Sequence, residues 1–463
     1  MLSRIKVFLV LLLALILPQH LIRCGHNKIN INFAGSSFKK IIKFPSSATE
    51  YLVDTNKLPG VSFQGKLVQY AGLLPVFGSK NPNDTLFFWY FESENKRSND
   101  LVQDASLLAE HGPFSGFDRK TKKLTNNPHS WHQDAHIVYV DQPFGVGFSN
   151  LTGQTKVENE TQVGETIFNF LVNFFRVFPR LRNKDIYLAA ASILSNGEID
   201  ERNKFRLKGI SINSAVIDQY FRQVVAAAIP YAVEQNLINA TEQASLQALL
   251  DKCEPTIGSK NSSEATGAEY TTGFGKCDVA IAALGIIYKS NPCFSIHDVR
   301  YNCSNPAPPF LLVNSEFDYV AFLQNPKLLE QIHMPANSPP WKLCNEILRP
   351  DHSLVTVNII PRLTEHIKVV IWSGDKDPLI NHIGTEFAIG NMSWGGETGF
   401  KNNQLQPILD KDNNKVIGKL HTERNLTYVI VHDAGHLVSI DQPKSSRFIL
   451  QKTVLDDPLK LEK

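Results

Sequence analysis

The sequence predicts an α/β fold with a doubly wound, mostly parallel sheet, and two observations carry that prediction. Apolar strand-like runs alternate with an amphipathic helix-like run between residues 137 and 212, as expected when helices connect parallel strands. Two further buried runs, 367–372 and 427–431, each end in a polar turn. Open α/β sheets place their functional groups at such strand ends, so these turns are the expected site.

Each expected element has a local reason. Residues 164–178 place Phe and Leu side chains on one helical face, and Pro179 ends that helix. From 214 to 340 the pattern becomes helical and rich in cysteine, which predicts a cap inserted into the domain. The strands expected before the cap, bounded by Gly, Pro or charged turns, cover 61–90 (several short strands), 137–140, 186–188 and 208–212.

Residues 1–24 are predicted to be a secretory signal peptide. Arg4 and Lys6 precede an apolar run at 7–17 of eleven residues, which is too short to span a membrane. The folded domain is then expected over 45–463, in a chain that is secreted or lysosomal and has no membrane association once the signal is removed.

Eight Asn-x-Ser/Thr sequons agree with that route and predict glycosylation. The formal net charge of +2 and the lack of a basic patch argue against a nucleic-acid partner. The sequons are at Asn83, Asn150, Asn159, Asn239, Asn261, Asn302, Asn391 and Asn425.

The cysteines predict disulfides confined to one module. Of six, Cys24 lies at the signal boundary, and four of the remaining five fall between 253 and 303. Those four, Cys253, Cys277, Cys293 and Cys303, are expected to pair among themselves. Cys344 is then expected to be a free thiol.

Asp377 and His436 follow the two C-terminal strands, in the order in which α/β hydrolases carry the acid and the histidine of a catalytic triad. The nucleophile should precede both. Taken alone, the two residues are better explained as a turn aspartate and a buried histidine.

Several collinear stretches over about 50–445 resemble the serine carboxypeptidases, the lysosomal cathepsin A group in particular. They include Leu86-Phe-Phe-Trp-Tyr-Phe-Glu-Ser93, Glu110-His-Gly-Pro-Phe114, Tyr139-Val-Asp-Gln-Pro-Phe-Gly-Val-Gly-Phe-Ser149, Ser373-Gly-Asp-Lys-Asp377 and Ala434-Gly-His436. The resemblance implies an α/β-hydrolase fold with a helical cap and removal of C-terminal residues from peptides at acidic pH. It also implies that Asp377 is the triad acid, His436 the base, and Glu110 a residue near the substrate carboxylate.

The chain departs from this family at the oxyanion loop. Members carry a strand and a glycine-rich loop between the motifs that end here at Ser93 and begin at Glu110. Only sixteen residues, 94–109, join them, and they contain no glycine. They read as a charged turn and a short helix over 100–109. The departure predicts the loss of an oxyanion donor, worth about 3–4 kcal/mol, and of a central strand.

The second departure is at the nucleophile. An ungapped alignment places the family serine on Ser192, inside Ala190-Ala-Ser-Ile-Leu194, where the flanking glycines of the strained elbow are replaced by larger residues. A gapped alignment removes the elbow and makes 189–203 the helix that follows it. Leu194 and the alanine-rich context favour the gapped alignment.

These departures have further consequences under the resemblance. The family partners of Glu110 in recognising a terminal carboxylate are absent, since Ala191 stands at one position and the other lies in the missing loop. The family partner of Cys344 would lie in that same loop. A carboxylate pair needs a shared proton to bind another carboxylate, so Glu110 alone is not expected to do so.

No cofactor or metal is expected. His129, His132 and His136 have metal-like spacing but lie in an expected loop. Three hypotheses stay open: a carboxypeptidase from which two coding segments are missing, a non-catalytic secreted binding glycoprotein (a pseudoenzyme), and an esterase or peptidase that uses Ser192. The partner is a peptide or ester substrate if the chain is active, and a homodimer stays open.

Overall fold

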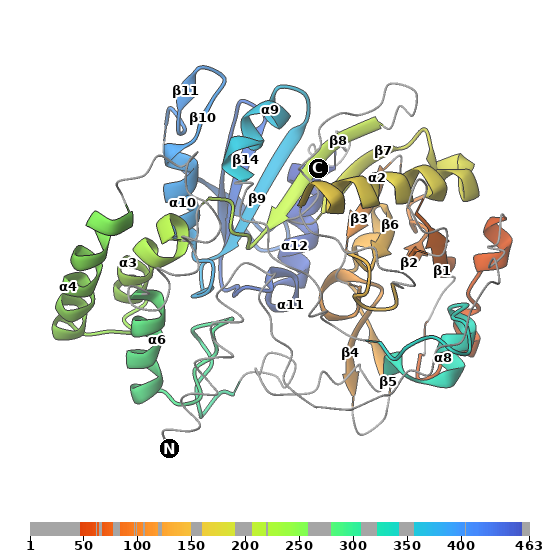
Figure 1. Cartoon of the computed structure of the whole chain (residues 1–463), viewed down its shortest axis with the longest axis horizontal. Coiled ribbons are helices and arrows are strands. Elements are labelled where there is room, and N and C mark those ends of the chain that lie inside the picture. The colour runs from red at the N-terminus through yellow and green to blue at the C-terminus, as the bar shows by residue number, and fades with distance from the viewer. Residues whose placement is uncertain are drawn as a thin grey trace.

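The computed structural model of the chain shows an α/β domain around one large twisted sheet (Figure 1). The structure describes residues 47–61, 63, 67–76, 84–96, 98, 100–104, 107–118, 123–149, 160–189, 206–218, 221–257, 279–306, 322–341, 356–402 and 404–455.

The main sheet has ten strands in the order β1-β2-β6-β3-β7-β8-β9-β14-β13-β12. The six strands from β6 to β14 run parallel, and antiparallel strands form both edges. The strands are β1 (Gln69–Pro75), β2 (Thr85–Phe91), β3 (Asp100–Asp104), β6 (His136–Val140), β7 (Asp185–Ala189), β8 (Arg206–Asn213), β9 (Lys368–Gly374), β12 (Gln406–Leu409), β13 (Val416–Glu423) and β14 (Leu426–Val431). Two small hairpins, β4 (Phe114–Asp118) with β5 (Lys123–Asn126) and β10 (Ser393–Trp394) with β11 (Glu397–Thr398), lie outside it.

The centre of the sheet corrects two expectations. Residues 100–104, expected to begin a helix, form β3, which pairs in parallel with β6 and with β7. The expected loss of a central strand is therefore also wrong. A strand between two parallel neighbours satisfies its backbone N–H and C=O groups on both sides, and this long-range gain outweighs a weak local helix preference. A helical turn follows only at η4 (Leu107–His111).

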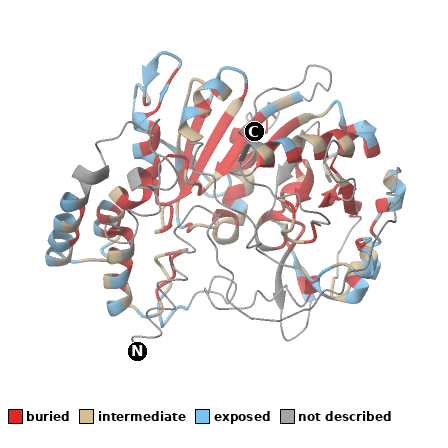
Figure 2. Cartoon of the chain, viewed as in Figure 1, coloured by how far each residue is buried: buried red, intermediate tan, exposed pale blue. Residues whose placement is uncertain are grey.

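One face of the sheet is covered by α2 (Glu160–Val177), α9 (Ile360–Thr364) and α10 (His382–Asn391). The predicted helix at 164–178 is thus confirmed, with a start four residues earlier. Phe170 and Phe174 are fully buried against Phe88 of β2. Burying an aromatic ring of this size contributes about 2–3 kcal/mol, so this face is anchored by α2 (Figure 2).

The opposite face is covered by η4, α8 (Pro326–Gln331), α11 (Val438–Asp441), α12 (Pro443–Ile449) and η11 (Leu450–Val454). A bidentate ion pair fastens α12 to the turn before β6, because the Arg447 guanidinium lies 2.6 and 3.1 Å from the two oxygens of the buried Asp134 carboxylate. This layer carries the chain segment that immediately follows His436.

A third apolar cluster lies within a helical module at one end of the molecule (Figure 1). It consists mainly of η8 (Phe221–Val225), α3 (Ala226–Glu234), α4 (Ala240–Ile257) and α6 (Val279–Ser290). These helices fall within the section 214–340 that the sequence assigns to a cap. Among the described residues, no helix is long and apolar enough to cross a membrane.

The disulfide between Cys293 and Cys303 confirms pairing within the cysteine cluster. Cys277 and Cys344 lie outside the described residues, and Cys253 lies on α4, where its side chain is not described. The free thiol at Cys344 stays a prediction, as does the signal peptide over 1–24, which also falls outside the described part.

Candidate active site

Asp377 and His436 meet at the carboxyl edge of the sheet. Strands β9 and β14 are parallel neighbours, with Gly374 opposite Val431, so their following turns emerge side by side. The Nδ1 atom of His436 lies 3.0 Å from Oδ2 of Asp377. The predicted proximity of these two side chains is confirmed.

The carboxylate of Asp377 is held from behind by its own turn. Its Oδ1 atom accepts hydrogen bonds from the backbone N–H groups of Leu379 and Ile380, at 2.8 and 3.1 Å. The residue is fully buried. With Oδ1 occupied, Oδ2 faces the imidazole, and a carboxylate in this position fixes the tautomer that carries its proton on Nδ1.

The two turns also bind each other through the backbone. Lys376 N–H donates to the carbonyl oxygen of Ala434 at 2.8 Å. Gly374 has no side chain, and a Cβ there would lie 2.2 Å from the Ala434 oxygen and 2.3 Å from the Gly435 oxygen. The distance between acid and histidine is therefore set by close backbone packing.

His436 is polarised by two acidic residues. Burial lowers the pKa of its imidazole, but the charge of Asp377, the hydrogen bond to it and the charge of Glu110 act together to raise the pKa above the ordinary value. Its Nδ1 faces Asp377, so Nε2 is the atom available to take a proton from another group.

Glu110 lies close enough to influence His436. It sits on η4, directly after β3, and its side chain is partly exposed. The structure thus brings Glu110 within electrostatic reach of the Asp377–His436 pair, while its role near a substrate carboxylate stays a prediction. At the end of η4 the His111 ring stacks on Trp131 with centroids 3.7 Å apart, and its Nδ1 lies 3.2 Å from the Tyr139 hydroxyl.

His297 is a neighbour that the sequence did not indicate. Its ring centroid lies 5.8 Å from that of His436, and its carbonyl oxygen accepts the His436 backbone N–H at 2.7 Å. It stands in the loop between Cys293 and Cys303, far from the other site residues in the chain. A lone histidine between two cysteines carries no local pattern that predicts this contact.

Ser192, the nucleophile expected from the ungapped alignment, lies outside the described residues. What the structure does describe is the strand that leads to it. Leu188 belongs to β7 as expected, and so does Ala189, which the gapped alignment made the first residue of a helix. Parallel pairing with β3 and β8 fixes them as strand, so any helix here begins after Ala189.

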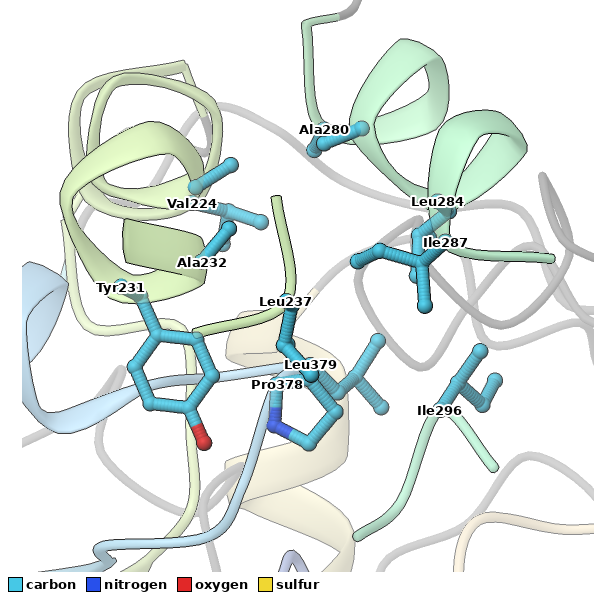
Figure 3. A pocket seen from close by; sticks show the side chains of 12 residues that line it. Val224, Tyr231, Ala232, Leu237, Ala280, Leu284, Ile287, Ile296, Pro378 and Leu379 are labelled. Atoms are coloured by element: carbon cyan, nitrogen blue, oxygen red, sulfur yellow. The ribbon is translucent and has the colours of Figure 1, made fainter. Parts of the chain in front are cut away.

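An apolar cavity lies beside the Asp377 turn (Figure 3). Pro378 and Leu379 form one wall, and α3 and α6 supply the facing side chains, among them Tyr231 and Leu284. The Tyr231 hydroxyl donates to the carbonyl oxygen of Asp375 at 3.3 Å. The helical module thus covers the buried side of the acid turn with hydrocarbon.

The histidines with metal-like spacing make contacts elsewhere and do not join this site. His132 is buried between Ser130 and Glu94, at 2.7 and 3.0 Å, and His136 bonds the Tyr90 hydroxyl at 2.9 Å. Among the described residues, no group of three or more His, Cys, Asp or Glu side chains is arranged to hold a metal ion.

Half of the predicted glycosylation sites can be placed. Their asparagines are exposed, so the structure leaves room for a glycan at each: Asn239, Asn302, Asn391 and Asn425. The others, Asn83, Asn150, Asn159 and Asn261, lie outside the described residues.

Comparison with known proteins gives a consistent picture. A family model described as serine carboxypeptidase matches residues 59–456. The pheromone-processing carboxypeptidase kex1 of Aspergillus niger is 29% identical over 448 residues, covering 88% of this chain and 70% of that protein. The same enzyme of Penicillium rubens is 29% identical over 457 residues, covering 88% and 71%.

The fold agrees with a solved structure. The crystal structure of Kex1(delta)p, a prohormone-processing carboxypeptidase from Saccharomyces cerevisiae, matches with a TM-score of 0.75 at 22% identity, over 90% of this chain and 98% of that one. The architecture is that of an α/β hydrolase, and the chain belongs to the serine carboxypeptidase family.

Proposed function

We propose that this chain is a serine carboxypeptidase scaffold which keeps the acid–base half of the catalytic machinery and has lost the ability to turn over peptides. The observation that carries the proposal is the hydrogen bond between Asp377 and His436, next to the Glu110 charge. In this family such a pair activates a serine that attacks the carbonyl of the C-terminal peptide bond. Peptides that enter the secretory pathway are the corresponding substrate class.

The expected chemistry is general base and then general acid catalysis by one imidazole. Nε2 of His436 would take the serine proton, and Asp377 would stabilise the imidazolium that forms. The same Nε2 would then return the proton to the departing amino group. Both steps need a nucleophile within hydrogen-bond reach of Nε2.

Two sequence features argue that those steps do not occur in this chain. No Gly-x-Ser-x-Gly motif is present anywhere in it, and residues 94–109 supply no glycine for an oxyanion loop. Loss of one oxyanion donor alone costs about 10²–10³ in kcat. Loss of the nucleophile removes the covalent route.

A second candidate, catalysis by Ser192, is favoured by one observation. Strand β7 ends at Ala189, three residues before this serine, and its parallel neighbours β3 and β8 give it the same direction as β9 and β14. A serine shortly after β7 therefore starts from the same sheet edge as His436. The bulky Leu194 still opposes a tight elbow there.

Labelling with a serine-directed phosphonate, followed by peptide mass mapping, separates the two candidates. The proposal expects no serine whose labelling depends on His436, so the wild type and a His436→Ala variant should give the same map. Label on Ser192 that disappears in His436→Ala would replace the proposal by the second candidate. A variant of an exposed residue, Asp412→Asn, serves as the control for handling.

The transcript shows whether the protein made in the cell also lacks the glycine-rich loop and the nucleophile elbow. Sequencing across codons 93–110 and 187–193 should show no additional coding segment if the chain is a pseudoenzyme. An inserted segment that encodes the glycine-rich loop and the elbow would make the native protein an ordinary carboxypeptidase instead.

A further inference from the structure

One short segment of the loop between Cys293 and Cys303 touches both turns of the acid–base pair. The carbonyl oxygen of His297 accepts the His436 N–H at 2.7 Å, and the Val299 N–H donates to the Lys376 oxygen at 3.0 Å. The disulfide closes this loop at both ends. The two turns that carry Asp377 and His436 therefore share a support that belongs to neither strand.

Asp298 and Arg300 make that support rigid. The Nε atom of Arg300 lies 3.0 Å from each carboxylate oxygen of Asp298, which is almost completely buried. The Nη1 atom of Arg300 donates to the carbonyl oxygen of Asp433 at 2.8 Å. The guanidinium thus ties the segment to the turn that leads to His436.

A second carboxyl group completes the cluster from the other side. Asp441, at the end of α11, accepts the Gly435 N–H on Oδ2 at 2.7 Å, and Nη2 of Arg300 lies 3.4 Å from the same oxygen. Nη2 of Arg300 also pairs with Oδ2 of Asp298, so two buried carboxyl groups face one guanidinium. Two carboxyl groups in such a place resist ionising together, and burial and the charge of Asp298 raise the pKa of Asp441.

Gly435 is pressed against this cluster. A Cβ at this position would lie 2.3 Å from the His297 oxygen and 2.8 Å from Cβ of Asp298. The residue directly before His436 therefore has no free space on the side of the carboxyl pair. Any separation of Asp298 and Asp441 is transmitted to the backbone of the histidine turn.

We propose that Asp298, Asp441 and Arg300 form a pH-sensitive clamp that positions His436, closed on one shared proton in acid and loosened when that proton is lost. The clamp acts through Gly435 and His297, so its members are positioning residues. The inference deepens the proposed function above and rests on the role given there to Asp377 and His436.

The proton balance follows from the charges. The closed pair carries one negative charge, which Arg300 neutralises. The open pair carries two, and the same guanidinium then faces two mutually repelling carboxylates. Burial raises the pKa of Asp441 to about 6; the hydrogen bond from Gly435 works against this rise, and the charge of Asp298 adds to it.

Because the pKa of Asp441 is raised in the folded protein, the closed clamp stabilises the fold in acid. Because the folded state binds the proton more tightly than the unfolded chain, the closed clamp contributes fully below the ordinary aspartate pKa and is lost as the pH rises through about 6. The clamp is therefore closed in acidic compartments and open at neutral pH.

Other titratable groups face the pair, and the nearest is His436, whose pKa is raised above its ordinary value because Asp377 and Glu110 outweigh its burial. Tyr301 and Tyr231 both have pKa values raised, first by burial and also by nearby carboxylates, so they stay neutral. On the elements packed against α11, Glu110 faces His436, Lys444 pairs with Asp410 and Asp412, and Arg447 pairs with Asp134.

The amide of Gly435 reports the clamp directly, because its N–H donates to Asp441. In protein labelled with ¹⁵N-glycine, the Gly435 amide shift of the wild type should show an inflection near pH 6. The ring Cε1–H shift of His436 should show the same inflection besides its own titration. A wild type in which the Gly435 shift is flat between pH 5 and 7 would overturn the proposal, whatever the variants do.

Two variants and a control sharpen the test. Asp441→Asn places a permanent donor opposite Asp298. The inflection near pH 6 should then vanish from both probes and leave only the titration of His436 itself. The hydrogen-exchange protection of residues 433–441, corrected for intrinsic rate, should lose its dependence on the Asp441 proton. In the wild type that protection should fall by about tenfold from pH 5 to 7. Asp298→Asn should move the inflection to lower pH, and Asp412→Asn should leave it unchanged.

An unchanged inflection in a folded Asp441→Asn protein would refute the clamp. If that variant does not fold, the wild-type titration and the Asp298→Asn variant still test the clamp. An inflection that Asp298→Asn leaves at the same pH would then refute it. Because no arm of the experiment measures turnover, a catalytically active chain would overturn the proposed loss of function without touching this result.

Discussion

The Oδ2 atom of Asp377 lies 3.0 Å from Nδ1 of His436 across a separation of 59 residues. The contact survives although the chain lacks the glycines that surround the nucleophile in its family. Two parallel strands, an Asp turn with two backbone donors and the buried Gly374 contact hold it in place. The geometry of the pair thus depends on the sheet and its turns.

Replacing Asp377 by Asn should lower the pKa of His436. Burial alone lowers that pKa, and the charge and hydrogen bond of Asp377 are the main groups that raise it. The measurement is an NMR titration of the histidine Cε1–H shifts. Asp412→Asn, which changes an exposed carboxylate, is the matched control. An unchanged His436 pKa in folded Asp377→Asn protein would contradict the assigned contact.

Gly374→Ala should destabilise the fold by about 1–3 kcal/mol or more, because the added methyl group overlaps two backbone oxygens of the histidine turn. Gly285→Ala is the matched control. Gly285 lies inside α6, where a Cβ meets nothing within 4 Å, so alanine should stabilise by up to about 1 kcal/mol. Urea denaturation checks both, and equal effects would argue against the close packing of the two turns.

The wild type should lose stability relative to Asp141→Asn as the pH rises from 5 to 8. Burial raises the pKa of Asp141 to about 7, although the hydrogen bond from the Phe148 N–H at 2.8 Å opposes this. A raised pKa means that the protonated carboxyl favours the folded state at low pH, and that this contribution disappears as the pH rises through about 7. Urea midpoints at the two pH values give the difference, and a pH-independent gap between the proteins would count against it.

Asp377, His436 and Glu110 were predictable because each follows a recognisable run in the sequence. For the first two, a strand and its polar turn are contiguous in the chain, so the local pattern contains the placement. The positions of His297 and Asp441 were not predictable. Their roles arise from contacts between loops that are far apart in sequence, and no local pattern marks them.

For strand β3 the local sequence pattern predicted the wrong secondary structure. The sequence around 100–104 offers no clear alternation of polar and apolar residues, and an alanine- and leucine-containing stretch follows it. What makes it a strand is the presence of β6 on one side and β7 on the other. Pairing partners decide such assignments, and a single sequence does not show them.

The most direct test of the central claim is hydrolysis of a blocked dipeptide by the purified chain between pH 4 and 7. The account predicts no turnover above that of the His436→Ala variant at any pH in this range. Turnover by the wild type that is abolished both by a serine-directed phosphonate and by His436→Ala would contradict it.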